Sequence, residues 1–224
     1  MSQEEGLSSC KVVLLGESGV GKTCIISRFI NNLFDDNTIS TNGASYAGKS
    51  MDFPDYGKSI KFEIWDTAGQ EKYRALTRIF YKDAAAAILV YDITRKESFE
   101  EIKNYWYGQI IDYAPKEIVI GIAANKSDLF DREQVTEEEA REYAKSIGAI
   151  FRLTSAMTAG GIEDLFDCVG KKYLDPSFVD DGKSHLPSKK TPQKTKSNSS
   201  SGGKGIVLDP SKSTSKKDSN KKCC

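Results

Sequence analysis

The stretch Gly16-Glu17-Ser18-Gly19-Val20-Gly21-Lys22-Thr23 matches the pattern GxxxxGK[ST], and it directly follows a short apolar run, KVVLL at 11–15. Glycines let the backbone turn tightly, so that successive N–H groups point at phosphate oxygens. Lys22 adds a cation, and the Thr23 hydroxyl is a ligand suited to magnesium. An amphipathic stretch follows at 22–34. The sequence therefore predicts a phosphate-binding loop between a strand and a helix.

The same alternation of apolar and amphipathic segments continues along the chain. Further apolar runs at 60–65, 84–91, 118–124 and 149–154 are short and bounded by turn residues, as expected for strands buried on both faces. Amphipathic stretches separate or follow them at 97–111, 136–147 and 161–174, and Thr136 with Glu139 forms a helix-start signature. Strands and helices in alternation predict an α/β fold with a doubly wound, mostly parallel sheet.

Cysteine usage and the N-terminus narrow the class of protein. Five cysteines, an odd number without a CxxC pair, support neither a disulfide framework nor a zinc site, and a reducing compartment fits best. Cys24 and Cys168 fall within amphipathic stretches, where we expect small buried apolar side chains. The acidic N-terminus does not resemble a secretory signal, and no apolar run is long enough to span a bilayer, so we expect a protein that is soluble as translated.

Charge divides the 224 residues into two parts. From Pro176 onward lysines outnumber aspartates by seven, so the preceding part is acidic by the same amount. This last part is rich in Ser, Lys, Gly and Thr, and it has too few apolar residues to offset the entropy of ordering. We therefore expect one folded domain over 8–175 and a disordered basic tail over 176–224 that ends in SNKKCC.

Two further motifs predict which nucleotide is bound. The stretch DTAGQ at 66–70 follows the second apolar run, and NKSD at 125–128 follows the fourth. Ligands of such sheets bind beyond the carboxyl ends of the strands. Asp128 can accept hydrogen bonds from the ring N–H and the exocyclic amine of guanine, whereas adenine presents the opposite pattern at that edge. The three motifs in this order favour a guanine nucleotide.

These residues resemble the small GTPases of the Ras superfamily and, within it, the Rab family. The similarity lies in KFEIWDTAGQE at 61–71, QEKYRAL at 70–76, FYKDA at 80–84, LVYDIT at 89–94, TSA at 154–156 and the Cys-Cys end. The resemblance implies a mostly parallel six-stranded sheet flanked by helices. It also implies a GTP/GDP switch that regulates intracellular vesicle trafficking.

The resemblance further implies a nucleotide site with defined roles. Lys22 would contact the β- and γ-phosphates, Thr23 and Thr41 would ligate Mg²⁺, and Asp66 would support the metal through water. The Gly69 amide would sense the γ-phosphate. Phe34 would pack on the base, Asn125 and Asp128 would read it, and the Ala156 amide would meet the guanine oxygen. In full, the implied GTP-binding residues are Ser18, Gly19, Val20, Gly21, Lys22, Thr23, Cys24, Phe34, Thr41, Asp66, Gly69, Asn125, Lys126, Asp128, Ser155, Ala156 and Met157.

The implied reaction is transfer of a phosphoryl group to water. Gln70 would orient the attacking water, and no arginine is an obvious finger for the transition state, so we expect slow turnover that depends on a separate activator. Two alternatives stay open. A scaffold that binds GTP without hydrolysis is disfavoured by the intact Gln70 and Thr41, and a P-loop kinase or ATPase is disfavoured by Asp128.

The resemblance also implies partners. Tyr46, Trp65 and Phe80 would form an aromatic triad that binds effectors, and Cys223 and Cys224 would carry geranylgeranyl groups. The expected partners are an exchange factor, a GTPase activator, an escort protein or dissociation inhibitor, effectors and a membrane, but no nucleic acid. The expected location is cytoplasmic, peripheral on the cytosolic face of an endomembrane.

Overall fold

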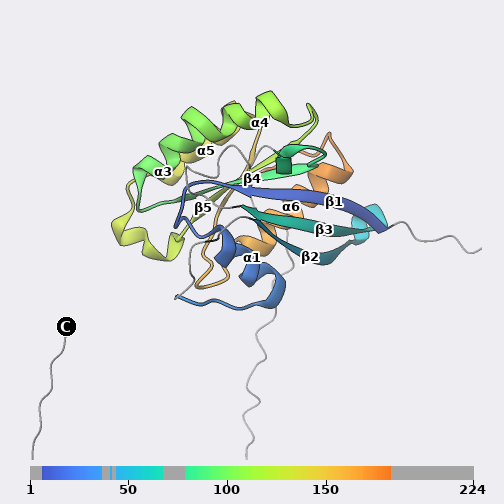
Figure 1. Cartoon of the computed structure of the whole chain (residues 1–224), viewed down its shortest axis with the longest axis horizontal. Coiled ribbons are helices and arrows are strands. Elements are labelled where there is room, and N and C mark those ends of the chain that lie inside the picture. Colours follow the sequence, from blue (N-terminus) through green and yellow to red (C-terminus); the bar gives the residue numbers. More distant parts are fainter. Residues whose placement is uncertain (1–6, 37–40, 42–43, 68–78, 183–224) are drawn as a thin grey trace, which may run out of the picture. The chain divides into compact units, whose positions relative to one another are not determined.

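The computed structural model describes residues 7–36, 41, 44–67 and 79–182, which include a six-stranded sheet with the order β2-β3-β1-β4-β5-β6 (Figure 1). The strands are β1 Leu7–Leu15, β2 Ala44–Phe53, β3 Lys58–Thr67, β4 Ala86–Asp92, β5 Val119–Asn125 and β6 Ile150–Leu153. β2 pairs with β3 in antiparallel fashion, and all other neighbours are parallel. The predicted α/β sheet is therefore confirmed.

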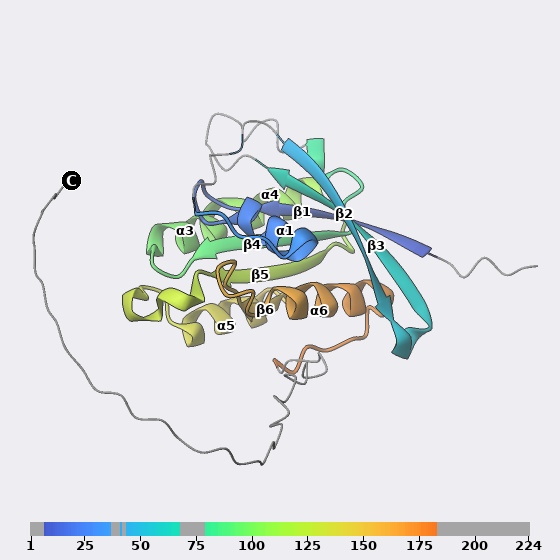
Figure 2. The same ribbon diagram turned by 90° about the horizontal axis from the view of Figure 1, so that it is seen from below.

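Helices cover both faces of the sheet (Figures 1 and 2). The helices and helical turns are α1 Lys22–Asn31, η1 Pro54–Tyr56, α3 Lys96–Glu101, η3 Ile102–Trp106, α4 Tyr107–Tyr113, η4 Ser127–Arg132, α5 Glu137–Ser146 and α6 Ile162–Leu174. α1 and α6 bury one apolar core, in which Phe29 stacks on Phe166 with 3.8 Å between the ring centroids. The segments from α3 to α4, together with α5, bury a second core on the opposite face.

Local sequence signals account for several element ends. The Glu139 N–H donates to the Thr136 hydroxyl at 3.2 Å, so the predicted N-cap of α5 is confirmed. The hairpin between β2 and β3 turns through η1, and Gly57 closes it with a φ of 57°. The predicted helix at 97–111 contains a π-helical turn, η3, between α3 and α4.

The sheet orders the ends of the strands into one functional edge. Because β1, β3, β4 and β5 run parallel, their carboxyl ends meet on the same side, where the loops after Leu15, Thr67, Asp92 and Asn125 begin. Every residue of β4 is buried. Most residues of the edge strand β2 are instead exposed or half-buried, and only its last residue, Phe53, is buried.

Residues 176–182, which the sequence analysis assigned to the tail, pack on the domain. The buried guanidinium of Arg152 in β6 donates to both carboxylate oxygens of Asp180, at 2.7 and 2.9 Å, and also pairs with Asp164 of α6. Lys172 donates to the carbonyls of Pro176 and Phe178, each at 2.7 Å. These contacts fix a segment whose composition alone gives no sign of order.

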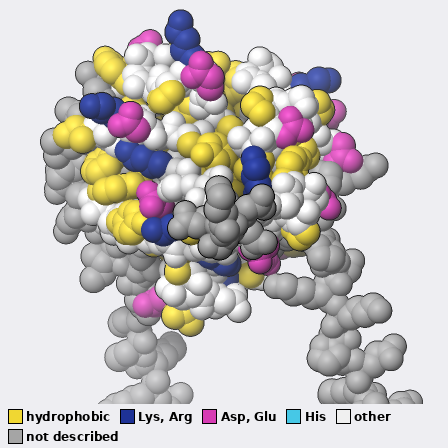
Figure 3. Space-filling model, turned by 90° about the vertical axis from the view of Figure 1, so that its right-hand side faces the viewer, with side chains coloured by type: hydrophobic (Ala, Val, Ile, Leu, Met, Phe, Trp, Pro, Cys, Tyr) yellow, Lys and Arg dark blue, Asp and Glu magenta, His cyan; other side chains and the backbone are white. Residues whose placement is uncertain are grey.

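The surface of the domain carries a mixture of side-chain types. On the face shown in Figure 3, hydrophobic side chains are scattered among acidic and basic ones, as is ordinary for a domain surface. Cys168 is fully buried, as predicted, whereas Cys24 is only partly buried. Within the described ranges, no helix has the length and apolar character needed to cross a membrane.

Candidate nucleotide-binding site

The loop after β1 adopts a backbone that glycine allows. Gly16, Gly19 and Gly21 all have positive φ, at 143°, 77° and 98°. A side chain at Gly16 would collide with the carbonyl of Val90, and one at Gly21 would collide with the Asn125 amide. Gly16 and Gly21 are therefore required by both conformation and space, whereas Gly19 is required by its conformation alone.

Lys22 stands at the start of α1 with its ammonium group turned back into the loop. Its Nζ donates to the carbonyls of Gly16 and Glu17, both at 2.8 Å. Burial lowers the pKa of Lys22 to about 8, although the negative charges of Asp66 and Glu17 oppose the shift. A cation thus lies against the backbone of the glycine-rich loop, an arrangement suited to phosphate oxygens.

Three oxygen-bearing side chains converge beside this lysine. The Thr23 hydroxyl lies 2.7 Å from the Thr41 hydroxyl and 2.6 Å from Asp66 Oδ2, which the Thr41 hydroxyl approaches to 3.1 Å. The second oxygen, Asp66 Oδ1, is buried and has no hydrogen-bond partner among the described residues. Burial raises the pKa of Asp66 despite the hydrogen bond from Thr23 and the charge of Lys22. Hydroxyl and carboxylate oxygens are the ligands that Mg²⁺ prefers, so this cluster fits the metal.

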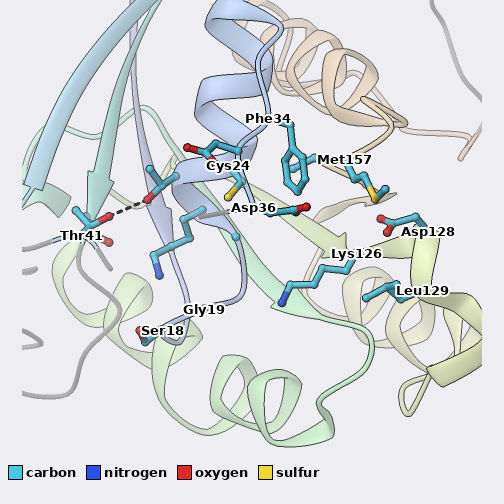
Figure 4. Close-up of a pocket in the computed structure, with 16 residues that line it drawn as sticks. Ser18, Gly19, Cys24, Phe34, Asp36, Thr41, Lys126, Asp128, Leu129 and Met157 are labelled. Atoms are coloured by element: carbon cyan, nitrogen blue, oxygen red, sulfur yellow. Dashed lines mark hydrogen bonds between the residues drawn. The ribbon is translucent and has the colours of Figure 1, made fainter. Parts of the chain in front are cut away.

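A second group of predicted residues lies at the other end of the pocket (Figure 4). Phe34, which follows α1, points into the pocket near Met157, and Asp128 lies beyond them. The Ser155 hydroxyl donates to Asp128 Oδ1 and also accepts from the Thr158 N–H at 3.1 Å. An aromatic face and a carboxylate with a fixed direction form an end suited to a planar base with N–H donors.

One cavity of about 370 Å³ joins the two ends, which is within the usual size range for small-molecule sites. Its lining includes twelve predicted residues: Ser18, Gly19, Gly21, Lys22, Thr23, Cys24, Phe34, Thr41, Lys126, Asp128, Ala156 and Met157. Asp35, Asp36, Thr67 and Leu129 also line it and were not predicted.

Four predicted residues lie behind this lining. The Val20 side chain is fully buried in the core, and its carbonyl accepts from the Asn125 side-chain amide at 2.8 Å. Asn125 also accepts from the Thr154 hydroxyl, so it joins the phosphate loop to the segment after β6. Asp66 and Ser155 contact the lining through the hydrogen bonds described above. Gly69, Gln70, Cys223 and Cys224 lie outside the described residues.

Sequence reasoning missed a charged cluster at the end of β4. Asp92 is buried, and its Oδ2 lies 2.7 Å from Lys126 Nζ and 4.0 Å from Arg95 Nε. Burial would raise the pKa of Asp92, but hydrogen bonds from Lys126 and Thr94 outweigh it and hold the pKa below its ordinary value. Arg95 donates to the Ser18 carbonyl at 3.1 Å. One buried carboxylate thus holds two cations against the pocket and its phosphate loop.

The predicted aromatic triad is brought together in space. Tyr46 of β2 contacts Trp65 of β3 with 5.5 Å between ring centroids, and Trp65 lies 5.3 Å from Phe80. Tyr46 is 50% exposed, whereas the other two rings are half-buried against the core. The row of rings is accessible from its Tyr46 end.

Comparisons with known proteins agree with this geometry. The sequence pattern described as the Ras family matches residues 11–175. The chain is 43% identical over 202 residues to Ras-related protein Rab-22A of Mus musculus, covering 90% of this chain and 93% of that one. It is 45% identical over 168 residues to Ras-related protein Rab-31 of Homo sapiens, covering 74% and 85%. Ras-related protein Rab-21 of Bos taurus is 43% identical over 173 residues, or 77% of each chain.

Proposed function

The chain belongs to the Ras family, as a Rab-like GTPase that hydrolyses GTP and regulates vesicle trafficking, and from this we propose how its own residues hold and process the nucleotide. The guanine base occupies the end formed by Phe34, Asp128 and Met157. The phosphates occupy the glycine-rich loop beside Lys22. One continuous cavity with a cationic, N–H-rich end and a carboxylate end supports this orientation.

Magnesium is the proposed cofactor. Thr23 and Thr41 would hold it directly, and Asp66 would support it, because their oxygens already converge within hydrogen-bond distance. When bound, the metal supplies positive charge to the phosphate oxygens during transfer. The carboxylate of Asp66 would remain ionised beside such a cation.

Other residues of the chain bind the phosphates and position the attacking water. Lys22 binds phosphate oxygens, the loop's N–H groups orient them, and Gln70 positions the attacking water. Positioning of this kind without an arginine finger gives slow hydrolysis, so a GTPase activator is a proposed partner. The segments around Thr41 and Gln70 change conformation with the presence of the γ-phosphate. Effectors bind the GTP-dependent conformation through Tyr46, Trp65 and Phe80.

Membrane attachment is proposed through the two terminal cysteines. A Cys-a-a-X box would need cysteine at position 221, which is lysine, so Cys223 and Cys224 would be modified by the double-cysteine route with an escort protein. A single lipid chain binds membranes marginally, whereas two chains helped by Lys216, Lys217, Lys221 and Lys222 bind stably. Attachment of this kind places the domain on the cytosolic face of an endomembrane.

Two experiments test these proposals separately. In a competition assay with the native chain and Mg²⁺, GTP and GDP should displace bound labelled GDP, whereas ATP at the same concentration should not. Displacement by ATP as effective as that by GTP would refute the guanine orientation. Intact-mass analysis of protein from a eukaryotic host should show two geranylgeranyl additions, which the double variant Cys223→Ser, Cys224→Ser should lack. An unmodified native C-terminus would refute the lipid anchor.

A further inference from the structure

The side chain of Arg28 joins two chain segments that form the same end of the pocket. Arg28 lies in the last turn of α1, outside the set of residues that line the cavity. Its Nε donates to the Ala156 carbonyl at 2.7 Å, and its Nη2 donates to the Met157 carbonyl at 3.0 Å. Its Nη1 donates to both the carbonyl and the side-chain oxygen of Asn32, at 2.8 and 3.0 Å. Two of these four hydrogen bonds therefore join α1 to residues 128 and 129 positions further along the chain, and the other two stay within the end of the helix.

On the helix side, these bonds fix the direction in which the chain leaves α1. Asn32 ends the helix in the left-handed conformation, with a φ of 55°, and its N–H donates to the Arg28 carbonyl at 3.0 Å. Because Arg28 holds both oxygens of Asn32, this turn has little freedom to rotate. Phe34 follows two residues later and points into the pocket (Figure 4).

On the loop side, the same group fixes the backbone after β6. The Ser155 N–H donates to the Gly160 carbonyl at 3.0 Å, which closes the loop on itself but leaves the carbonyls of Ala156 and Met157 to find other donors. Both carbonyls accept from Arg28. The orientation of the two peptide groups that line the base end is thus set from α1.

We propose that Arg28 is a positioning residue that holds Phe34 and the Ala156–Met157 backbone at a fixed spacing and thereby slows nucleotide release. This inference rests on the proposed placement of guanine at that end of the pocket. The guanidinium suits the task because its five N–H donors lie in one plane with fixed directions. A lysine ammonium is a compact point charge on a flexible stem, and it does not reproduce the fork.

The test compares release of the nucleotide with its hydrolysis. We expect Arg28→Ala to release a ribose-labelled fluorescent GDP about tenfold faster than the native chain in saturating Mg²⁺, since two charge-assisted hydrogen bonds to the loop are lost. Arg28→Lys should release it at an intermediate rate. Single-turnover hydrolysis of GTP already bound should stay within about twofold of native, because the phosphate end is untouched. A merely structural defect would change both rates.

Asn32→Gly is the matched control on the same helix end. Glycine keeps the left-handed conformation and the carbonyl acceptor, and it removes only the side-chain oxygen that Arg28 contacts. Its release rate should stay within about twofold of native. Thermal unfolding of each variant with bound nucleotide shows which variants are folded. If Arg28→Ala does not fold, the release rate of Arg28→Lys is compared with that of the native chain instead.

The outcomes separate the inference from the proposed function. A native chain that fails to bind labelled GDP would overturn both. Native binding with unchanged release from Arg28→Ala would overturn the role of Arg28 alone. Equal changes in release and hydrolysis would also overturn it, because the effect would then not be confined to the base end. An Asn32→Gly variant that releases nucleotide as fast as Arg28→Ala would overturn it as well, because the contacts of Arg28 with the Ala156–Met157 backbone would then add nothing.

Discussion

Thr23 donates its hydroxyl hydrogen to Asp66 at 2.6 Å, although Thr23 belongs to the first turn of α1 and Asp66 lies near the end of β3, 43 residues further along the chain. The Thr41 hydroxyl also donates to this carboxylate oxygen, at 3.1 Å. The contact exists because β1 and β3 are parallel neighbours whose carboxyl ends lie side by side. Three segments that are separate in the sequence therefore share one small group of oxygens, and the first prediction concerns that group.

We predict that Thr23→Asn weakens GTP binding in Mg²⁺ on the order of tenfold, since the proposed metal ligand and its contact with Asp66 are lost. GDP binding should fall less, because no γ-phosphate then depends on the metal. Equilibrium titrations with labelled nucleotide, in Mg²⁺ and in chelator, measure both effects. Thr23→Ser keeps the hydroxyl and should bind GTP nearly as tightly as the native chain. Undiminished GTP affinity of Thr23→Asn with metal present would exclude Thr23 as a ligand.

Gln70→Leu should leave GTP affinity intact and slow single-turnover hydrolysis at least about tenfold, because the water loses its orienting side chain while the phosphate loop is unchanged. Gln70 lies outside the described residues, and its proposed role is the one that the resemblance to the family implies. The measurement is the rate at which protein preloaded with GTP releases phosphate, which should be lower for Gln70→Leu than for the native chain. Gln109→Leu, which makes the same change in α4 away from the pocket, is the control and should hydrolyse GTP at the native rate.

The pKa of Lys22 predicts a pH dependence of nucleotide binding. Burial lowers this pKa to about 8, so the ammonium group of the nucleotide-free protein loses its proton above that pH. Bound phosphate would favour the charged form, so binding at pH 9 should take up close to one proton per nucleotide, and affinity should fall from pH 7 to pH 9. Calorimetry in two buffers with different ionisation enthalpies counts the protons. An equal heat in both buffers at pH 9 would show that Lys22 is charged before binding.

The lowered pKa of Lys22 also makes the folding stability of the nucleotide-free chain depend on pH. Between about 8 and the ordinary value of 10.5, the unfolded chain binds more protons at this lysine than the folded, nucleotide-free chain does. Deprotonation of Lys22 therefore removes the cost of burying a charge. The contribution of Lys22 to the stability of the folded, nucleotide-free chain increases as the pH rises from about 8 to 10.5. Nucleotide binding and stability should thus respond to pH with opposite signs.

Local constraints explain why the phosphate loop could be predicted from the sequence. The backbone has positive φ at positions 16, 19 and 21, and glycine is the residue that adopts such a conformation most easily. The strand before the loop and the helix after it are predicted by the residues directly beside the loop. Thr136 at the start of α5 was predictable for the same reason. The aromatic triad and the oxygen cluster were anticipated only through the resemblance to a family, since no periodicity brings Thr41 to Asp66.

Residues that act across long sequence separations gave no such signal. Arg28 looks like an ordinary basic residue in the last turn of a helix, and its partners in the loop after β6 lie beyond residue 155. Asp92 follows an apolar strand, and only the pairing of β4 with β5 brings it next to Lys126. Strand ends were missed for a related reason. β1 begins at Leu7 because it pairs with β3 from that point, although Ser8 and Ser9 are polar.

The last prediction concerns the end of the folded domain. Asp180 should contribute about 2 kcal/mol to the free energy of unfolding at pH 7, because it accepts two hydrogen bonds from the buried guanidinium of Arg152. Asp180→Ala would keep the ion pair of that cation with Asp164 and remove the one with Asp180. Asp131→Ala removes an exposed carboxylate from η4 and serves as the control, with an expected change below about 0.5 kcal/mol. Urea unfolding of the full chain measures both.

The pH dependence of this effect provides a second test. Burial would raise the pKa of Asp180, but hydrogen bonds from Arg152 and from the Gly182 N–H outweigh it and hold the pKa below its ordinary value. The stabilisation is therefore present above the pKa of the unfolded chain, about 3.9, and is lost as the pH falls through the lower folded value. The stability difference between native and Asp180→Ala should stay constant from pH 7 to pH 5 and shrink below about pH 4. A difference that is absent at pH 7 would place the end of the folded domain before residue 180.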